Sequence, residues 1–116
     1  MTKYKIVLIP FPFDDLSANK VRPAVCLTDP IGLHKHVVLA FITSKTPDHL
    51  LESDIIIDAS APDFPSTGLK MTSTIRLHRL MTVTTDLILR QLGELSPKMR
   101  VQVKTRLNQL FALGNC

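Results

Sequence analysis

The sequence is poor in glycine and cysteine and has no long apolar run. Four glycines occur among 116 residues, and they are scattered along the chain. A glycine-rich loop that could cradle phosphates is therefore missing, and a nucleotide-binding fold is not expected. No apolar segment approaches the ~20 residues needed to span a bilayer, so we do not expect insertion into a membrane.

The two cysteines are placed too unevenly to predict a disulfide. Cys26 lies inside an apolar segment and Cys116 is the last residue, so a bridge would tie a core position to a chain end. We expect both thiols to be reduced, as in the cytoplasm. The apolar run near the N-terminus is short and lacks a small-residue cleavage site, so we interpret it as a strand rather than a signal peptide. The sequence thus predicts a cytoplasmic protein.

Basic residues are concentrated in the second part of the chain. Residues 1–69 hold six Lys and Arg against eight Asp and Glu, whereas residues 70–116 hold eight against two. This asymmetry favours a polyanionic partner such as nucleic acid. A basic face that is merely solvated would give the same pattern.

Short apolar runs rich in β-branched residues predict strands at five places. The runs cover residues 4–9, 21–28, 37–43, 54–58 and 72–80. Pro10 and Pro12 end the first strand because proline has no N–H to donate to a ladder. The segments between the runs, rich in proline, serine and aspartate, are predicted loops.

The last of these strands alternates in character. Period-2 geometry places Ile75 and Leu77 on its core side, together with Ser73 and Arg79. Arg76 and His78 fall on the opposite face, with Thr74 beside them.

A helix is predicted near the C-terminus. Ser96 and Pro97 provide an N-cap and a preset first position. Apolar residues then recur at helical spacing up to Gly114, at Met99, Val103, Leu107, Leu110 and Phe111. Before it, Thr84 to Leu89 predict a short helical turn, and Gly93 ends or bends the next segment. Together these patterns predict a mainly β fold with a C-terminal helix, a small, partly open barrel that forms a single domain over residues 1–116.

Two clusters could carry acid–base or metal chemistry. Asp14 and Asp15 are the only adjacent carboxylates, and such pairs can exchange protons, although a solvated turn explains them equally. His34 and His36 flank Lys35 and could share a strand face as metal ligands, but an isolated pair in a polar turn is commonly solvated. Nothing in the sequence requires a metal or cofactor.

Cationic and hydroxyl side chains collect at predicted strand ends. They are Lys20, Arg22, Thr43, Ser44, Ser73, Arg76 and His78. A guanidinium group can hold two phosphoryl oxygens and stays charged at any working pH, so an arginine with hydroxyl donors suits a phosphate. The plainer alternatives are a loop arginine before a proline for Arg22 and a strand-end threonine for Thr43.

Four segments, in this order, resemble the MazF/PemK-like toxin family. They are IVLIPFPFDDLSANKVRPAVCLTD (residues 6–29), VLAFITS (38–44), GLKMTSTIRLHRLMTV (68–83) and LGELSPKMRVQVKTRL (92–107). The loop with Pro-Phe-Pro-Phe followed by Lys-x-Arg-Pro is the most specific of them. At the start, Tyr4-Lys5 replaces the usual glycine and acidic residue, and we expect this to alter local packing.

The resemblance implies a fold and an activity. It implies an SH3-like barrel of five to seven short, mostly antiparallel strands, assembled as a homodimer. It also implies a metal-independent endoribonuclease that cleaves single-stranded RNA at a short motif and is inhibited by a cognate antitoxin protein.

The resemblance also suggests roles for individual residues. The catalytic arginine and threonine of the family fall on Arg22 and Thr43. RNA-binding roles are expected for Phe13, Lys20, Ser44, Ser73, Arg76 and His78. In the implied reaction the 2′-hydroxyl attacks its own phosphate, giving a cyclic phosphate and a free 5′-hydroxyl. His78 is the one candidate base.

Two other functions fit the sequence. The barrel could bind a protein partner without cutting RNA, because the gyrase-poisoning CcdB toxins share the fold. Alternatively, the protein could be an RNA-binding regulator.

Overall fold

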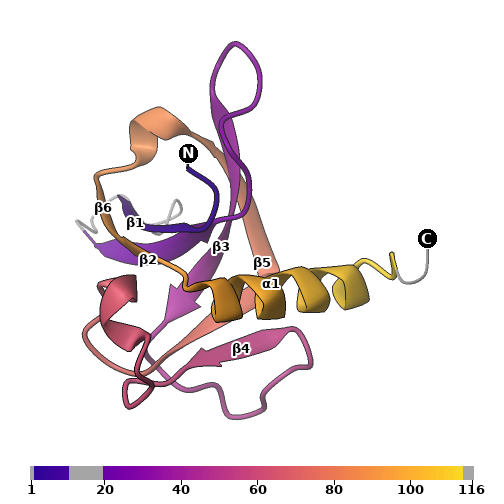
Figure 1. The fold of residues 1–116 in the computed structure, drawn as a ribbon. Helices are drawn as coiled ribbons and strands as arrows, with labels where there is room; N and C mark the ends of the chain where they lie inside the picture. Colours follow the sequence, from indigo (N-terminus) through magenta and orange to yellow (C-terminus); the bar gives the residue numbers. More distant parts are fainter. Residues whose placement is uncertain (1, 11–19, 114–116) are drawn as a thin grey trace.

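The computed structural model describes residues 2–10 and 20–113, which form a strongly curved sheet with a helix packed against it (Figure 1). In chain order the elements are β1 (Lys5–Pro10), β2 (Val21–Cys26), β3 (His36–Thr43), β4 (Asp54–Ile57), η1 (Phe64–Thr67), β5 (Ser73–Thr84), η2 (Thr85–Leu87), β6 (Arg90–Glu94) and α1 (Pro97–Leu110).

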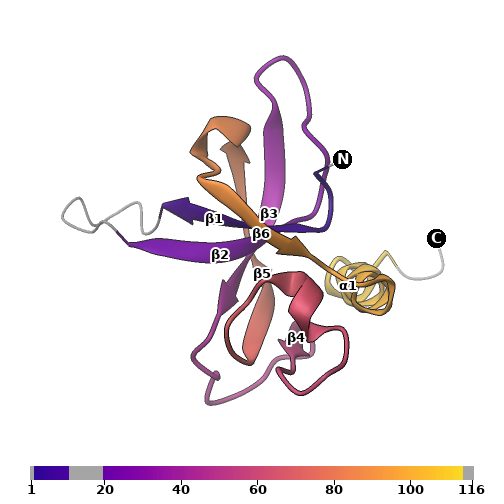
Figure 2. The ribbon, with the colours of Figure 1, turned by 60° about the vertical axis from the view of Figure 1, so that its left-hand side comes forward.

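All neighbouring strands of the sheet are antiparallel. Their order is β4-β5-β3-β2-β1-β6, and the sheet curls so that it forms a half-barrel, as Figure 2 shows from the side. At one edge, a Cβ atom on Gly93 of β6 would lie 2.3 Å from the carbonyl oxygen of Ser66 in η1. The backbone that follows β4 therefore touches β6, across the open side of the curl. The predicted fold class, a small β barrel with a C-terminal helix, is confirmed.

β6 was not predicted as a strand, because the sequence indicated only an end or a bend at Gly93. β6 has the sequence RQLGE, and its polar composition gives little strand signal. It is a strand because it pairs with β1, where Lys5 lies opposite Glu94. That partner is 89 residues away, so local propensity could not reveal the pairing. β5 also continues beyond its predicted end, to Thr84.

Apolar side chains are buried on both faces of the sheet. One cluster packs under α1 and includes Ile6, Val25, Ile42, Ile75, Leu77 and Val103. The other lies on the opposite face and includes Val7, Ile9, Ala24, Cys26, Leu39 and Phe41. Successive residues of β1 thus enter different clusters, as period 2 requires. Burial on both faces explains why the strands are continuous apolar runs in the sequence.

The start of α1 follows the predicted cap. Ser96 Oγ accepts a hydrogen bond from the Met99 N–H at 3.2 Å and donates one to Asp63 at 2.6 Å. Met99 and Val103 are buried. The predicted apolar face is wrong at its far end, because the helix extends past the sheet (Figure 1) and leaves Leu110 and Phe111 exposed.

Tyr4 has a left-handed backbone with φ of 71°. A side chain in this region costs ~1 kcal/mol or more. Its ring contacts two cations, Lys3 Nζ at 5.2 Å and the Arg100 guanidinium at 5.3 Å from the centroid. These contacts offset part of the backbone strain.

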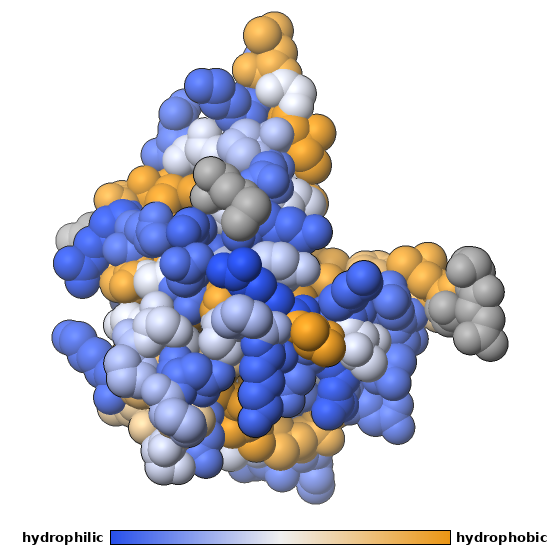
Figure 3. All heavy atoms as spheres, viewed as in Figure 1, coloured by the Kyte–Doolittle hydropathy of each residue, from blue (hydrophilic) through white to orange (hydrophobic). Residues whose placement is uncertain are grey.

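Exposed apolar side chains gather at two ends of the molecule. Ile31 and Leu33 lie on the connection between β2 and β3, which projects at the top of Figure 3. Phe111 and Leu113 follow the C-terminal end of α1. No helix in the described part of the chain is long and apolar enough to cross a membrane.

Candidate functional site

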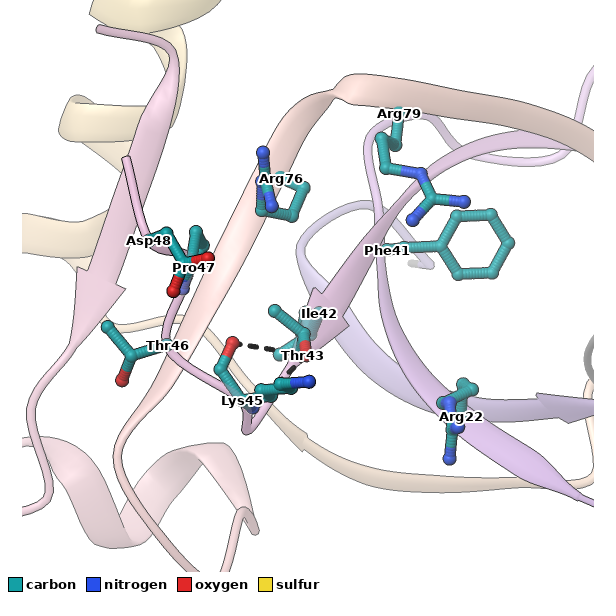
Figure 4. A pocket seen from close by; sticks show the side chains of 10 residues that line it. All are labelled: Arg22, Phe41, Ile42, Thr43, Lys45, Thr46, Pro47, Asp48, Arg76 and Arg79. Carbon is teal, nitrogen blue, oxygen red and sulfur yellow. Dashed lines mark hydrogen bonds between the residues drawn. The ribbon is translucent and has the colours of Figure 1, made fainter. Parts of the chain in front are cut away.

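A cleft of about 380 Å³ opens on the face of the sheet opposite α1. Strands β2, β3 and β5 and the segment after β3 supply its walls (Figure 4). Its lining residues are Arg22, Phe41, Ile42, Thr43, Lys45, Thr46, Pro47, Asp48, Arg76 and Arg79.

Strand register explains why these side chains meet. Across four adjacent strands, Asp54 lies opposite Arg76, Arg76 opposite Phe41, and Phe41 opposite Ala24. Directly opposed residues in an antiparallel sheet point to the same face. Arg22 lies two residues before Ala24 and therefore points to this face as well.

Arg22 and Thr43 line the same cleft from the neighbouring strands β2 and β3. The β2–β3 pairing ends at Ala24 and Phe41, two residues short of Arg22 and of Thr43. Just beyond this last pair, Pro23 has no N–H to donate to the ladder. Arg22 is exposed, whereas the Thr43 hydroxyl accepts from the Lys45 N–H at 3.1 Å and lies 3.4 Å from the Lys45 carbonyl oxygen. The open end of this strand pair forms the floor of the cleft.

Arg76 is anchored from behind by Asp54. The Asp54 side chain has no exposed surface, and its Oδ1 accepts from Arg76 Nε at 2.8 Å. Its Oδ2 accepts from the Leu51 N–H at 2.9 Å. His78 also faces this carboxylate, with Nδ1 4.0 Å from Oδ1, and it is not among the residues that line the cleft.

Arg79 was predicted on the core side of its strand, and that prediction is wrong. The register between β3 and β5 shifts, because Phe41 pairs with Arg76 while the preceding Ala40 pairs with Leu80. Residues 77–79 therefore fall within a bulge, which re-aims side chains. The Arg79 guanidinium lies over the Phe41 ring, inside the cleft. In the sequence, its closeness to Arg76 and His78 was the feature that could have indicated a place in the site.

The cleft is strongly cationic. Four of its side chains are positively charged, namely Arg22, Lys45, Arg76 and Arg79, and the carboxylate in its lining is Asp48. Two residues with hydroxyl groups, Thr43 and Thr46, lie among them. Such a site can bind anionic oxygens by charge-assisted hydrogen bonds.

The other predicted residues lie elsewhere. Ser44 and Ser73 line a second cavity of about 450 Å³, and Ser73 is buried with its hydroxyl donated to the Met71 carbonyl at 2.8 Å. Lys20 is exposed and immediately precedes β2. Phe13, Asp14 and Asp15 lie outside the described residues.

Two candidate chemistries receive no geometric support. His34 and His36 have ring centroids 6.0 Å apart, and within residues 2–10 and 20–113 no three His, Cys, Asp or Glu side chains converge as they would around a metal ion. Burial raises the pKa of the Cys26 thiol to about 11, so it stays protonated at neutral pH and is a poor nucleophile.

Comparison with known proteins identifies relatives over nearly the whole chain. Residues 2–111 match the model of a family described as the PemK-like, MazF-like toxin of type II toxin-antitoxin systems. No curated protein matches the chain in sequence.

Solved structures share the fold at low sequence identity. The Mycobacterium tuberculosis toxin MazF-mt6 is 21% identical, with a TM-score of 0.70 over 93% of this chain and 96% of that one. An endoribonuclease in complex with its cognate antitoxin, from a mycobacterial species, is 17% identical, with a TM-score of 0.68 over 97% and 96%. A mycobacterial endoribonuclease is 15% identical, with a TM-score of 0.68 over 97% and 91%.

Proposed function

Because the chain belongs to the PemK-like, MazF-like toxin family of type II toxin-antitoxin systems, we propose that it is an endoribonuclease that cleaves single-stranded RNA in the cationic cleft. The observation that carries this proposal is that Arg22 and Thr43 line one cleft, which holds three further cations. Two of the similar structures are themselves endoribonucleases.

The proposed reaction uses the RNA as its own nucleophile. The 2′-oxygen forms a bond to the adjacent phosphorus and loses its proton, while the bond from phosphorus to the 5′-oxygen breaks and that oxygen gains a proton. The products are a 2′,3′-cyclic phosphate and a free 5′-hydroxyl. This step requires neither a protein nucleophile nor a metal ion.

Arg22 and Thr43 would stabilise the charge that develops on phosphorus oxygens. Arginine keeps its proton at neutral pH, with a pKa above ~12, so Arg22 is assigned to charge neutralisation rather than to proton abstraction. The Thr43 hydroxyl would donate to a non-bridging oxygen, exchanging its weak 3.4 Å contact with the Lys45 carbonyl for the substrate.

Single-stranded RNA suits the site better than a duplex. Unstacked bases can be read by edge contacts and stacking, whereas an A-form duplex hides its base edges. For Lys20, Phe13, Ser44, Ser73 and His78 we retain roles in binding the RNA beyond the cleft. The proposed protein partners are a cognate antitoxin, as in one of the similar structures, and a second copy of the chain. The proposed location is the cytoplasm.

The proposal is tested with purified protein and a mixed-sequence single-stranded RNA in EDTA. We expect cleavage that leaves cyclic phosphate and 5′-hydroxyl ends, and Arg22→Ala should slow it by about 10²- to 10³-fold. Lys98→Ala, which removes an exposed charge from α1, is the matched control and should cleave at the wild-type rate. Intact RNA, or an Arg22→Ala variant as active as wild type, would reject the nuclease. Binding of RNA without shortening would instead indicate a regulator.

A further inference from the structure

The carboxylate of Asp54 is buried beside the cleft residue Arg76 and takes no part in the proposed reaction. Its side chain is fully buried, and an isolated buried carboxylate is strongly unfavourable unless it is paired. Both oxygens are accounted for, one by the Leu51 N–H at 2.9 Å and one by Arg76 Nε at 2.8 Å. The carboxylate is thus fixed to the backbone at the start of β4, and it fixes Arg76 in turn.

The ion pair with Asp54 uses Nε of Arg76 and leaves its two terminal nitrogens available to a ligand. A guanidinium group is planar, so a bond at Nε sets the direction of the two terminal nitrogens. Within the described part of the chain no hydrogen bond to those nitrogens is recorded, and Arg76 lines the cleft with a side chain that is 22% exposed. This is the arrangement of a fork that is held in place for an anionic ligand.

Arg76 and Arg22 extend from opposite sides of β3. β3 lies between their strands, so the two backbones are separated by two interstrand spacings, or ~10 Å. In Figure 4 the two side chains lie on opposite sides of β3 and point away from each other. A polynucleotide that crosses the cleft would therefore offer a different phosphate to each arginine.

We propose that Asp54 is a positioning residue that holds Arg76 as a second phosphate-binding group, for a phosphate neighbouring the one cleaved at Arg22. The inference rests on the proposed endoribonuclease function and adds a subsite to it. Arg76 acts in binding, so its loss should raise KM while kcat is retained. Asp54 acts through Arg76, whose Nε lies 2.8 Å from its Oδ1, rather than through the more distant His78 Nδ1 at 4.0 Å.

The first test is a double-variant cycle with an RNA oligonucleotide that carries phosphates on both sides of the cleavage point. Arg76→Ala and Asp54→Asn should each lower kcat/KM by about tenfold, the loss expected for one charge-assisted contact. The double variant should be no worse than Arg76→Ala alone. Further loss in the double variant would show that Asp54 acts independently and would overturn the proposal.

The second test removes the phosphate rather than the arginine. A series of oligonucleotides, each with one neutral methylphosphonate at a different position beside the cleavage site, should contain one member that wild type cleaves about tenfold less well. Arg76→Ala should be insensitive to that same replacement. If every member slows wild type and Arg76→Ala by equal factors, Arg76 binds no neighbouring phosphate and the subsite is rejected.

Controls keep the two proposals separable. Arg76→Lys preserves the charge but not the fork, so it should behave like Arg76→Ala even if Asp54→Asn fails to fold. Lys98→Ala should leave kcat/KM unchanged. If wild type leaves RNA intact, the proposed function fails. If wild type cleaves and Arg22→Ala does not, while Arg76→Ala and Asp54→Asn cleave normally, only the subsite fails.

Discussion

The guanidinium carbon of Arg79 lies 5.8 Å from the centroid of the Phe41 ring, so a cation of β5 covers an aromatic side chain of β3. Phe41 belongs to the buried cluster on this face, and Arg79 is exposed. The ring therefore supports the guanidinium at the surface of the cleft. A flat, exposed guanidinium can stack on a nucleobase.

Removing Arg79 should weaken RNA binding. We expect Arg79→Ala to raise KM for single-stranded RNA about tenfold while kcat changes less than twofold, because a stacked base is worth ~1–3 kcal/mol. Arg79→Lys should recover only part of the loss, since it restores the charge but not the plane. Steady-state cleavage of a fluorogenic oligonucleotide measures both constants. A fall in kcat with unchanged KM would place Arg79 in the chemical step instead.

Cys26 should be inert in the folded protein. It is buried in the cluster on the cleft face of the sheet, and its pKa is raised to about 11. In a Cys116→Ser variant, which leaves one thiol, an aromatic disulfide reagent at pH 8 should react only at the rate of unfolding. Addition of denaturant should expose one thiol per chain at once. Rapid labelling without denaturant would contradict the buried placement of β2.

The thiol also predicts an effect of alkaline pH on stability. The folded pKa is about 11 against an ordinary value of 9.0, so the unfolded chain loses this proton first. The contribution of the neutral thiol is complete below pH 9 and declines as the pH rises toward 11. Cys26→Ala should flatten the urea midpoint across this interval. An equally steep decline in that variant would assign the effect to other groups.

Glu94 should contribute to stability above its ordinary pKa of 4.5. The pKa of its carboxyl is lowered, first by the hydrogen bond from Lys5 and its charge, and then by Arg100. A lowered folded pKa means that this contribution is present above pH 4.5 and is lost as the pH falls through the folded value. Glu94→Gln should therefore show a smaller drop in urea midpoint between pH 6 and pH 3.5. The difference should shrink at high salt, because the Glu94 side chain is 42% exposed.

Gly93 should tolerate no side chain. A Cβ atom there would lie 2.3 Å from the Ser66 carbonyl oxygen and 2.5 Å from the Thr67 carbonyl carbon, both parts of the backbone. Gly93→Ala should lower the free energy of unfolding by at least ~1–3 kcal/mol, as for an overpacked core. Gly32→Ala is the matched control, because its Cβ would meet nothing within 4 Å and only the positive φ of 74° costs stability. Chemical denaturation should rank Gly93→Ala as the less stable variant.

The fold class followed from the sequence because its strands and helix are marked locally. Residues 21–28 and 37–43 are apolar and β-branched, and Ser96 with Pro97 marks the start of α1. β6 was not predicted because it is a strand only through its pairing with β1, which is distant in the sequence. The far end of α1 was misjudged because helical spacing cannot tell where the sheet beneath a helix stops.

The sequence predicted those residues of the candidate site that stand at the ends of strands. Arg22 and Thr43 stand at the start and the end of consecutive predicted strands, so an antiparallel pair brings them together. Arg79 could not be placed, because a bulge breaks the alternation on which the prediction relied. Asp54 could not be predicted as part of the site, because nothing in the local sequence shows that a carboxylate at the start of a strand pairs with Arg76.

The pairing of β1 with β6 has a consequence for synthesis of the protein. β1 leaves the ribosome before its partner, which follows 89 residues later, and at ~5–20 residues per second this delay is roughly 5 to 20 s. Sheets dominated by such distant pairings also fold slowly once the chain is complete. The cationic cleft lies on β2, β3 and β5 of this sheet, so a cleft within the complete sheet exists only after β6 has been synthesised.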